Sequence, residues 1–147
     1  METAKLAHDI KVITRYDEQG RIVEMFSQDD LVDNYLLAME VKKSGDLQKA
    51  AKMLELSTNP PSIYKGHYEQ LFIIYRKFYR QDMQDGNYQA VIDRINRMIK
   101  LDNEMLKAIV LHRTNIQNNP CTLDDVKDES NIKVSDLKTL QKALDLV

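Results

Sequence analysis

The same helical corner occurs twice in this chain, at Gly45 and again at Gly86. Each glycine is followed by a residue that can cap a helix, Asp46 in the first copy and Asn87 in the second. Apolar or small residues then recur at steps of three and four, which is the spacing of one face of an α-helix. A glycine stop followed by a capped amphipathic helix is how an antiparallel helix pair turns its corner. The corners therefore predict an array of helix pairs.

The composition agrees with one mainly helical domain. The chain has 147 residues, enough for a single core, and its four glycines and three prolines leave room for long helices. No apolar run approaches the roughly 20 residues that a membrane-spanning helix needs. Residues 1–5 lack the basic flank and apolar stretch of a secretory signal. Since the single cysteine, Cys121, cannot form an internal disulfide, a cytoplasmic location is expected.

The hydrophobic periodicity predicts a mainly α fold of about six helices. We expect a β-hairpin segment at 1–28, a helical domain at 29–118, and a polar loop with a C-terminal capping helix at 119–147. The strand pattern lies at 10–26 around a turn at 17–20, with a frayed amphipathic helix as the alternative. The predicted helices cover 29–44, 47–58, 63–84, 88–101, from 102 or 103 to about 118, and 135–147.

The apolar stripes of these helices also predict which side chains form the core. The longest predicted helix carries most of them, because its apolar residues repeat at steps of three and four over its whole length. The residues expected to be largely buried are Leu37, Ala38, Leu54, Leu71, Phe72, Tyr75, Phe78, Ile95 and Ile109.

Residues 29–118 resemble a degenerate array of tetratricopeptide (TPR) repeats. The bulky and small positions of that motif fall, in residues 31–64, on Leu37, Ala38, Val41, Ala50, Leu54 and Ser57. The second copy, 72–103, departs from the motif because Tyr79 stands at a position for a small side chain. The run at 61–68 is also similar to a segment of bacterial proteins, which brings no activity with it. The resemblance implies a scaffold that binds a partner.

The resemblance further implies a partner-binding groove lined by Tyr35, Lys42, Arg76 and Arg80. Further contacts are expected from the cationic and aromatic residues near the start of the long helix, namely Tyr64, Lys65, His67 and Tyr68. This mixture suits acidic or carboxylate-ended peptides and stacked single-stranded bases. A structural interpretation stays open beside it, in which the tyrosines belong to the core and the cations to the solvated edge of the helix. The residues of the TPR carboxylate clamp do not match here as a set.

No motif in the sequence predicts catalysis. The three histidines, His8, His67 and His112, are not at metal-ligand spacing, and Cys121 lies in a predicted loop without a paired base. A Gly-rich phosphate loop and a nucleophile elbow are also missing from the sequence. We therefore predict a protein that is not an enzyme and has no metal and no cofactor.

The predicted function is a non-catalytic protein–protein interaction module that binds a peptide or partner protein through a helical groove. The alternative is a nucleic-acid-associated regulator that uses the basic aromatic helix at 62–80. A third hypothesis is a hydrolase or transferase built around His67 and Tyr68. Because two helix pairs are fewer than the three or so repeats of a free-standing array, a homodimer is also expected. The C-terminal helix, on its polar tether, is expected to cap its own chain or to swap between chains.

Overall fold

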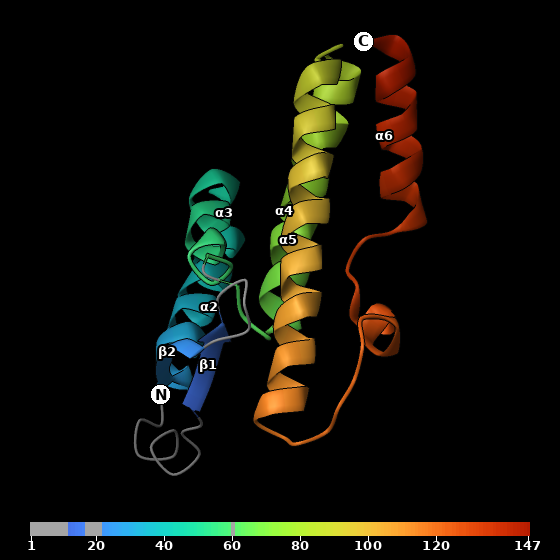
Figure 1. The fold of residues 1–147 in the computed structure, drawn as a ribbon. Helices are drawn as coiled ribbons and strands as arrows, with labels where there is room; N and C mark the ends of the chain where they lie inside the picture. Colours follow the sequence, from blue (N-terminus) through green and yellow to red (C-terminus); the bar gives the residue numbers. More distant parts are fainter. Residues whose placement is uncertain (1–11, 17–21, 60) are drawn as a thin grey trace.

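A computed structural model describes residues 12–16, 22–59 and 61–147 of the chain (Figure 1). The described part is mainly helical. Its elements, in order, are β1 (Val12–Tyr16), β2 (Ile22–Ser27), α2 (Gln28–Lys43), α3 (Leu47–Glu55), α4 (Lys65–Gln84), α5 (Tyr88–Asn115), the 3-10 helix η1 (Asp124–Glu129) and α6 (Val134–Leu146). Within the described ranges, no helix has the length and apolar character needed to cross a bilayer.

Both predicted corners are confirmed. Gly45 joins α2 to α3 with a φ of +96°, and Gly86 joins α4 to α5 with a φ of +77°. These angles lie in the left-handed region, which glycine adopts without a steric penalty. Asp46 caps α3 as expected, because its carboxylate accepts a hydrogen bond of 3.1 Å from the backbone N–H of Lys49. Asn87 precedes α5 but makes no side-chain capping bond.

The two strands pair antiparallel, from Val12 opposite Ser27 to Tyr16 opposite Ile22. A register shift lies between Arg15 and Tyr16. The predicted turn at 17–20 lies outside the described residues, so the hairpin as a unit stays a prediction. The same applies to the part of the 1–28 segment that precedes β1.

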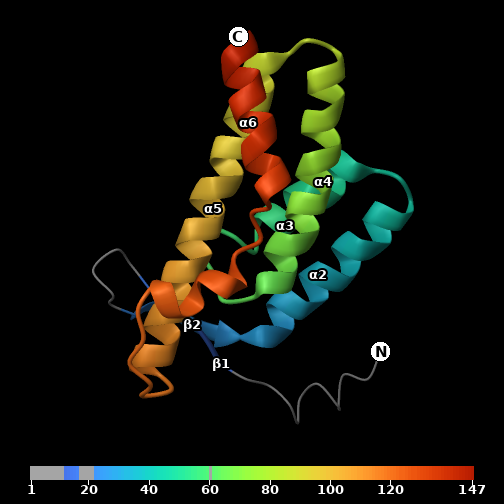
Figure 2. The ribbon, with the colours of Figure 1, turned by 90° about the vertical axis from the view of Figure 1, so that its right-hand side faces the viewer.

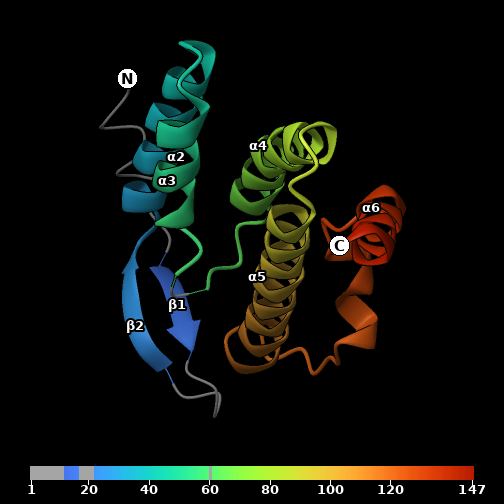
Figure 3. The ribbon, with the colours of Figure 1, turned by 90° about the horizontal axis from the view of Figure 1, so that it is seen from above.

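The helices form three layers. Figures 1 and 3 show α2 and α3 on one side, α4 and α5 side by side in the middle, and α6 on the far side. Figure 2 shows α6 lying along the α4–α5 pair, with the C-terminus near the corner at Gly86. The core lies between α3, α4 and α5, and its largest fully buried side chains are Leu54, Tyr68, Leu71, Phe72, Ile74, Tyr75, Val91, Ile95, Met98, Met105 and Val126.

Seven of the nine predicted core residues are buried, and two predictions need correction. Leu37 is 54% exposed, because it lies on the outer side of α2 while the neighbouring Ala38 faces α3. Phe78 is only partly buried, since its ring lines an open cleft that is described below.

The predicted break at 102 or 103 is wrong, because α5 continues through it to Asn115. Asp102 is a buried residue inside the helix and accepts hydrogen bonds from Ser130 and Asn131. The long predicted helix begins at Lys65 instead of 63, and α3 ends at Glu55. The backbone N–H of Ser62 donates to the hydroxyl of Tyr68, 3.0 Å away, which secures the chain ahead of α4.

The stretch 119–134 is more ordered than the predicted loop. It contains η1, whose Val126 is fully buried among the core residues. α6 then starts one residue before the predicted cap Ser135, at Val134, and its first turn is secured by Asp136. The predicted C-terminal helix is thus present.

Candidate functional site

The four residues of the predicted groove have different environments. The Tyr35 ring on α2 packs against the His67 ring of α4, with 4.9 Å between the centroids. Lys42 on α2 donates a 2.9 Å hydrogen bond to the side-chain oxygen of Gln70. Arg76 turns the other way, toward α6, and is only 4% exposed because its guanidinium pairs with Asp136. Arg80 is exposed. Arg76 is thus already paired within the chain, so these four side chains do not form one open groove.

The residues predicted to add contacts are mostly structural. Tyr68 is fully buried, as the structural interpretation expects for a core tyrosine. His67 is also buried, with the Tyr35 ring on one side and the Tyr64 ring 5.4 Å away on another. Its Nδ1 has no hydrogen-bond partner, and burial lowers the pKa of His67 to about 4. The ammonium nitrogen of Lys65 lies 4.0 Å from a carboxylate oxygen of Glu129.

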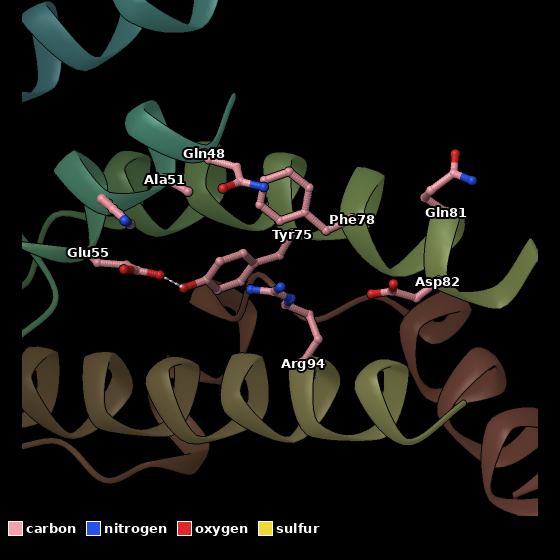
Figure 4. Close-up of a pocket in the computed structure, with 9 residues that line it drawn as sticks. Gln48, Ala51, Glu55, Tyr75, Phe78, Gln81, Asp82 and Arg94 are labelled. Carbon is pink, nitrogen blue, oxygen red and sulfur yellow. Dashed lines mark hydrogen bonds between the residues drawn. The ribbon is translucent and has the colours of Figure 1, made fainter. Parts of the chain in front are cut away.

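A concave site lies instead between α3, α4 and α5, and we call it the α3–α5 cleft. Figure 4 shows its side chains converging from the three helices. Its volume is about 410 Å³. The lining residues are Gln48, Ala51, Lys52, Glu55, Tyr75, Phe78, Gln81, Asp82 and Arg94. The cleft therefore combines an aromatic wall with charged groups of both signs.

Arg94 contacts two aromatic rings of the cleft and has an unpartnered nitrogen. Its guanidinium lies over the Tyr75 ring at 4.8 Å from the centroid and over the Phe78 ring at 5.1 Å. Contacts of a cation with aromatic faces at these distances are favourable, and arginine forms them readily because its guanidinium is planar. The Nε atom of Arg94 is buried and has no hydrogen-bond partner. A buried donor without a partner is costly, so a ligand oxygen at this place would be stabilising.

The Glu55 carboxylate of the cleft already interacts with other side chains of the protein. The Tyr75 hydroxyl donates a hydrogen bond to the Glu55 carboxylate, drawn as a dashed line in Figure 4. Burial, followed by the bond to Glu55, raises the pKa of Tyr75 to about 12, so this hydroxyl keeps its proton at neutral pH. Arg97 also interacts with Tyr75 and Glu55. Lys52 and Arg94 are the two cations among the residues that line the cleft, and Asp82 is its second carboxylate beside Glu55.

Sequence reasoning missed this cleft. Arg94 lies on a helix that was expected only to pack, and its aromatic partners come from α4. Both rings were expected to belong to the core, so no signal in the sequence set Tyr75 and Phe78 apart from the rest of the stripe. Among the residues that the structure describes, no group of three or more histidine, cysteine, aspartate and glutamate side chains is placed to hold a metal ion.

Comparisons with protein-family models, with curated proteins and with solved structures find no match for this chain. The likeness to TPR repeats therefore depends only on the residues quoted for it. We therefore infer function from the geometry of the α3–α5 cleft.

Proposed function

We propose that this protein is a non-catalytic interaction module that binds a peptide segment of a partner protein in the α3–α5 cleft. One observation carries the proposal. The guanidinium of Arg94 is held against Tyr75 and Phe78 inside a 410 Å³ cleft, while its buried Nε lacks a hydrogen-bond partner. A side chain fixed in this way is ready for a ligand and loses little conformational freedom on binding.

The chemistry of the cleft favours an acidic side chain of the partner. Guanidinium and carboxylate match in shape and form charge-assisted hydrogen bonds. Lys52 provides a second cation from α3, and the partly buried Phe78 ring can pack against the aliphatic stem of a glutamate. Gln48 and Gln81 supply donors and acceptors for a peptide backbone.

The wider predictions belong to the same proposal. The α3–α5 cleft lies between α3 of the first helix pair and α4–α5 of the second, and its lining includes none of the four residues of the groove that the TPR resemblance implies. We also propose the N-terminal hairpin, a cytoplasmic location and a homodimer.

The nucleic-acid alternative has less support. It needs exposed aromatic rings beside the cations of 62–80, but Tyr68 and Tyr79 are buried and Arg76 is ion-paired with Asp136.

Selection from a random peptide library displayed on phage, with the purified full-length chain as bait, tests the proposal. We expect enriched peptides to share an aspartate or glutamate, and Arg94→Gln to weaken their binding by about tenfold or more. Lys107→Gln is the matched control, because Lys107 is an exposed cation on the same helix. Equal binding by the Arg94→Gln variant, with its helical content unchanged, would refute the cleft as the site. If instead single-stranded DNA binds with an affinity that falls steeply with salt, the alternative is favoured.

A further inference from the structure

The α3–α5 cleft contains a carboxylate that the chain itself leaves without a partner. The Glu55 carboxylate accepts the hydrogen bond from Tyr75 and interacts with Arg97, so it is engaged within the chain. Asp82 is half-buried in the lining of the same cleft, and among the residues that the structure describes its side chain has neither a hydrogen-bond nor an ion-pair partner. This carboxylate can therefore accept a charge-assisted hydrogen bond from a ligand.

Asp82 lies close to the place where a ligand would meet Arg94. The Arg94 guanidinium is 4.8 Å from the centroid of the Tyr75 ring and 5.1 Å from that of Phe78. Asp82 follows Phe78 by four residues, so the two lie on one side of α4, about 6 Å apart along its axis. Figure 4 shows the Asp82 carboxylate turned toward the Arg94 guanidinium. A ligand group bound at Arg94 thus has Asp82 about one helical turn away.

The charges that remain for a ligand differ in sign along the cleft. Lys52 and Arg94 are positive, and Asp82, beyond Arg94 toward the end of α4, is negative. An acidic ligand group is attracted by Arg94 but repelled by the nearby Asp82 carboxylate. A ligand that also places a cation at Asp82 replaces this repulsion by an attraction, so the cleft discriminates between the two kinds of ligand.

The polar side chains of the cleft favour an extended ligand. Gln48 and Gln81 are amides that can bond to the backbone of a bound segment, and the Gln81 side-chain nitrogen already donates to Asp85 at 3.1 Å. A helix uses its backbone N–H and C=O groups internally, whereas an extended segment keeps them free. In an extended segment the side chains two positions apart point to the same side at a spacing of about 6.6 Å. This spacing matches the separation along α4 given above.

We propose that the α3–α5 cleft selects partner segments in which an acidic and a basic side chain stand two positions apart in an extended chain. The acidic side chain pairs with Arg94, and the basic side chain pairs with Asp82. This inference rests on the proposed function and deepens it, because it specifies which acidic segments bind. The evidence for it is the charge complementarity between such a segment and the unpartnered groups of the cleft.

Parallel selections from a random peptide library displayed on phage test the proposal, with the full-length chain and its Asp82→Lys variant as baits. The native chain is expected to enrich peptides with lysine or arginine two positions from the acid, at about threefold or more above the unselected library. Asp82→Lys is expected to lose this preference and to enrich a second acid in its place. Glu69→Lys is the matched control, because Glu69 is an exposed carboxylate on the same helix and is not part of the cleft lining.

A double-mutant cycle measures the pairing with Asp82 directly. One enriched peptide is synthesised with lysine and with glutamine at the basic position, and both forms are titrated against the native chain and Asp82→Asn by fluorescence anisotropy. The native chain is expected to bind the lysine form about threefold more tightly, whereas Asp82→Asn should bind both forms equally. A purely structural role of Asp82 would weaken both peptides by the same factor and would contradict the pairing.

The outcomes separate this inference from the function on which it rests. If the enriched peptides share an acid that depends on Arg94 but their basic residue is absent or indifferent to Asp82, the selection rule is wrong and the proposed function is kept. A basic residue three or four positions from the acid indicates a helical ligand and also overturns the rule. If no acid is enriched, both proposals are wrong. Loss of the basic preference in Asp82→Lys, together with equal affinities for Asp82→Asn, supports both.

Discussion

The two sides of α4 contact their neighbours through different kinds of interaction. Toward α3, α4 presents Phe72 and Tyr75, which belong with Leu54 to one cluster of buried side chains. Toward α6 it presents Arg76 and Tyr79, whose polar groups converge on one buried carboxylate. One helix thus has an apolar contact on one side and a buried ionic contact on the other.

The two contacts differ in how they contribute to stability. Apolar contacts are nondirectional and gain free energy in proportion to the area they bury, so many side chains share the stability of the α3–α4 contact. A buried ion pair is directional, and its net contribution is small because desolvation offsets the attraction. Its components regain water when the contact opens. The apolar side therefore contributes most of the stability, while the ionic side specifies the position of the C-terminal segment 130–147 on α4.

The largest expected effect is on the apolar side. Phe72→Ala removes a fully buried ring and should lower the free energy of unfolding by about 3–5 kcal/mol. Urea unfolding followed by circular dichroism measures it. A loss below about 1 kcal/mol would mean that the contact of α4 with α3 is not the main core.

On the ionic side, Asp136→Ala should act locally. It leaves the guanidinium of Arg76 without its partner, and the segment 130–147 then detaches so that Arg76 regains water. We expect the amides of α6 to lose protection by at most about 3 kcal/mol in hydrogen exchange, with α3 and α4 unchanged. Equal loss of protection in α3 would show that the two sides unfold together and that the comparison fails.

A third prediction uses the buried histidine on the apolar side. Because burial lowers the pKa of His67 to about 4 in the folded protein, the unfolded chain, with a pKa of 6.5, binds the proton first. Its contribution is complete above pH 6.5 and is lost as the pH falls toward 4. The expected loss is about 1–3 kcal/mol.

His67→Phe is the control for this prediction. It keeps a ring between Tyr35 and Tyr64 and removes the titration, so its stability should depend less on pH between 6.5 and 4. Burial also lowers the pKa of His112, and the difference between the parent and His67→Phe profiles removes that contribution. Asp136 does not interfere, since its lowered pKa makes its contribution disappear only below pH 3.8. If the parent and His67→Phe show parallel profiles of stability against pH, the pH dependence cannot be assigned to His67.

Local features of the fold could be predicted from the sequence, and features that join distant segments could not. Gly45 and Gly86 specify their turns by their own conformational freedom, so both corners were found. Asp102 was taken for a helix cap because a short polar residue between apolar ones is typical of a cap. Its partners, Ser130 and Asn131, lie 28 and 29 residues further along the chain, and no local pattern contains them.

The same limit applies to the candidate sites. The resemblance to TPR repeats placed Arg76 in a groove. No local pattern indicates its pairing with Asp136, because the two residues are 60 positions apart. Arg94 was overlooked because Tyr75 and Phe78 belong to another helix, so only the packing of α4 against α5 brings the three together. Periodicity identifies a helix face, but the pairing of charges across helices depends on which faces meet.

The smallest expected effect separates two neighbouring residues on α2, Leu37 and Ala38. The sequence pattern assigned both to the core, but the Leu37 side chain is 54% exposed while Ala38 is fully buried. Leu37→Gln should therefore change the free energy of unfolding by no more than about 0.5 kcal/mol. Ala38→Leu, in contrast, inserts a large side chain at the α2–α3 contact and should cost about 1–3 kcal/mol. Urea unfolding of the two variants under the same conditions measures both. If Leu37→Gln costs as much as Ala38→Leu, a surface that includes Leu37 is covered in solution, and a partner or second copy on the outer side of α2 would have to account for it.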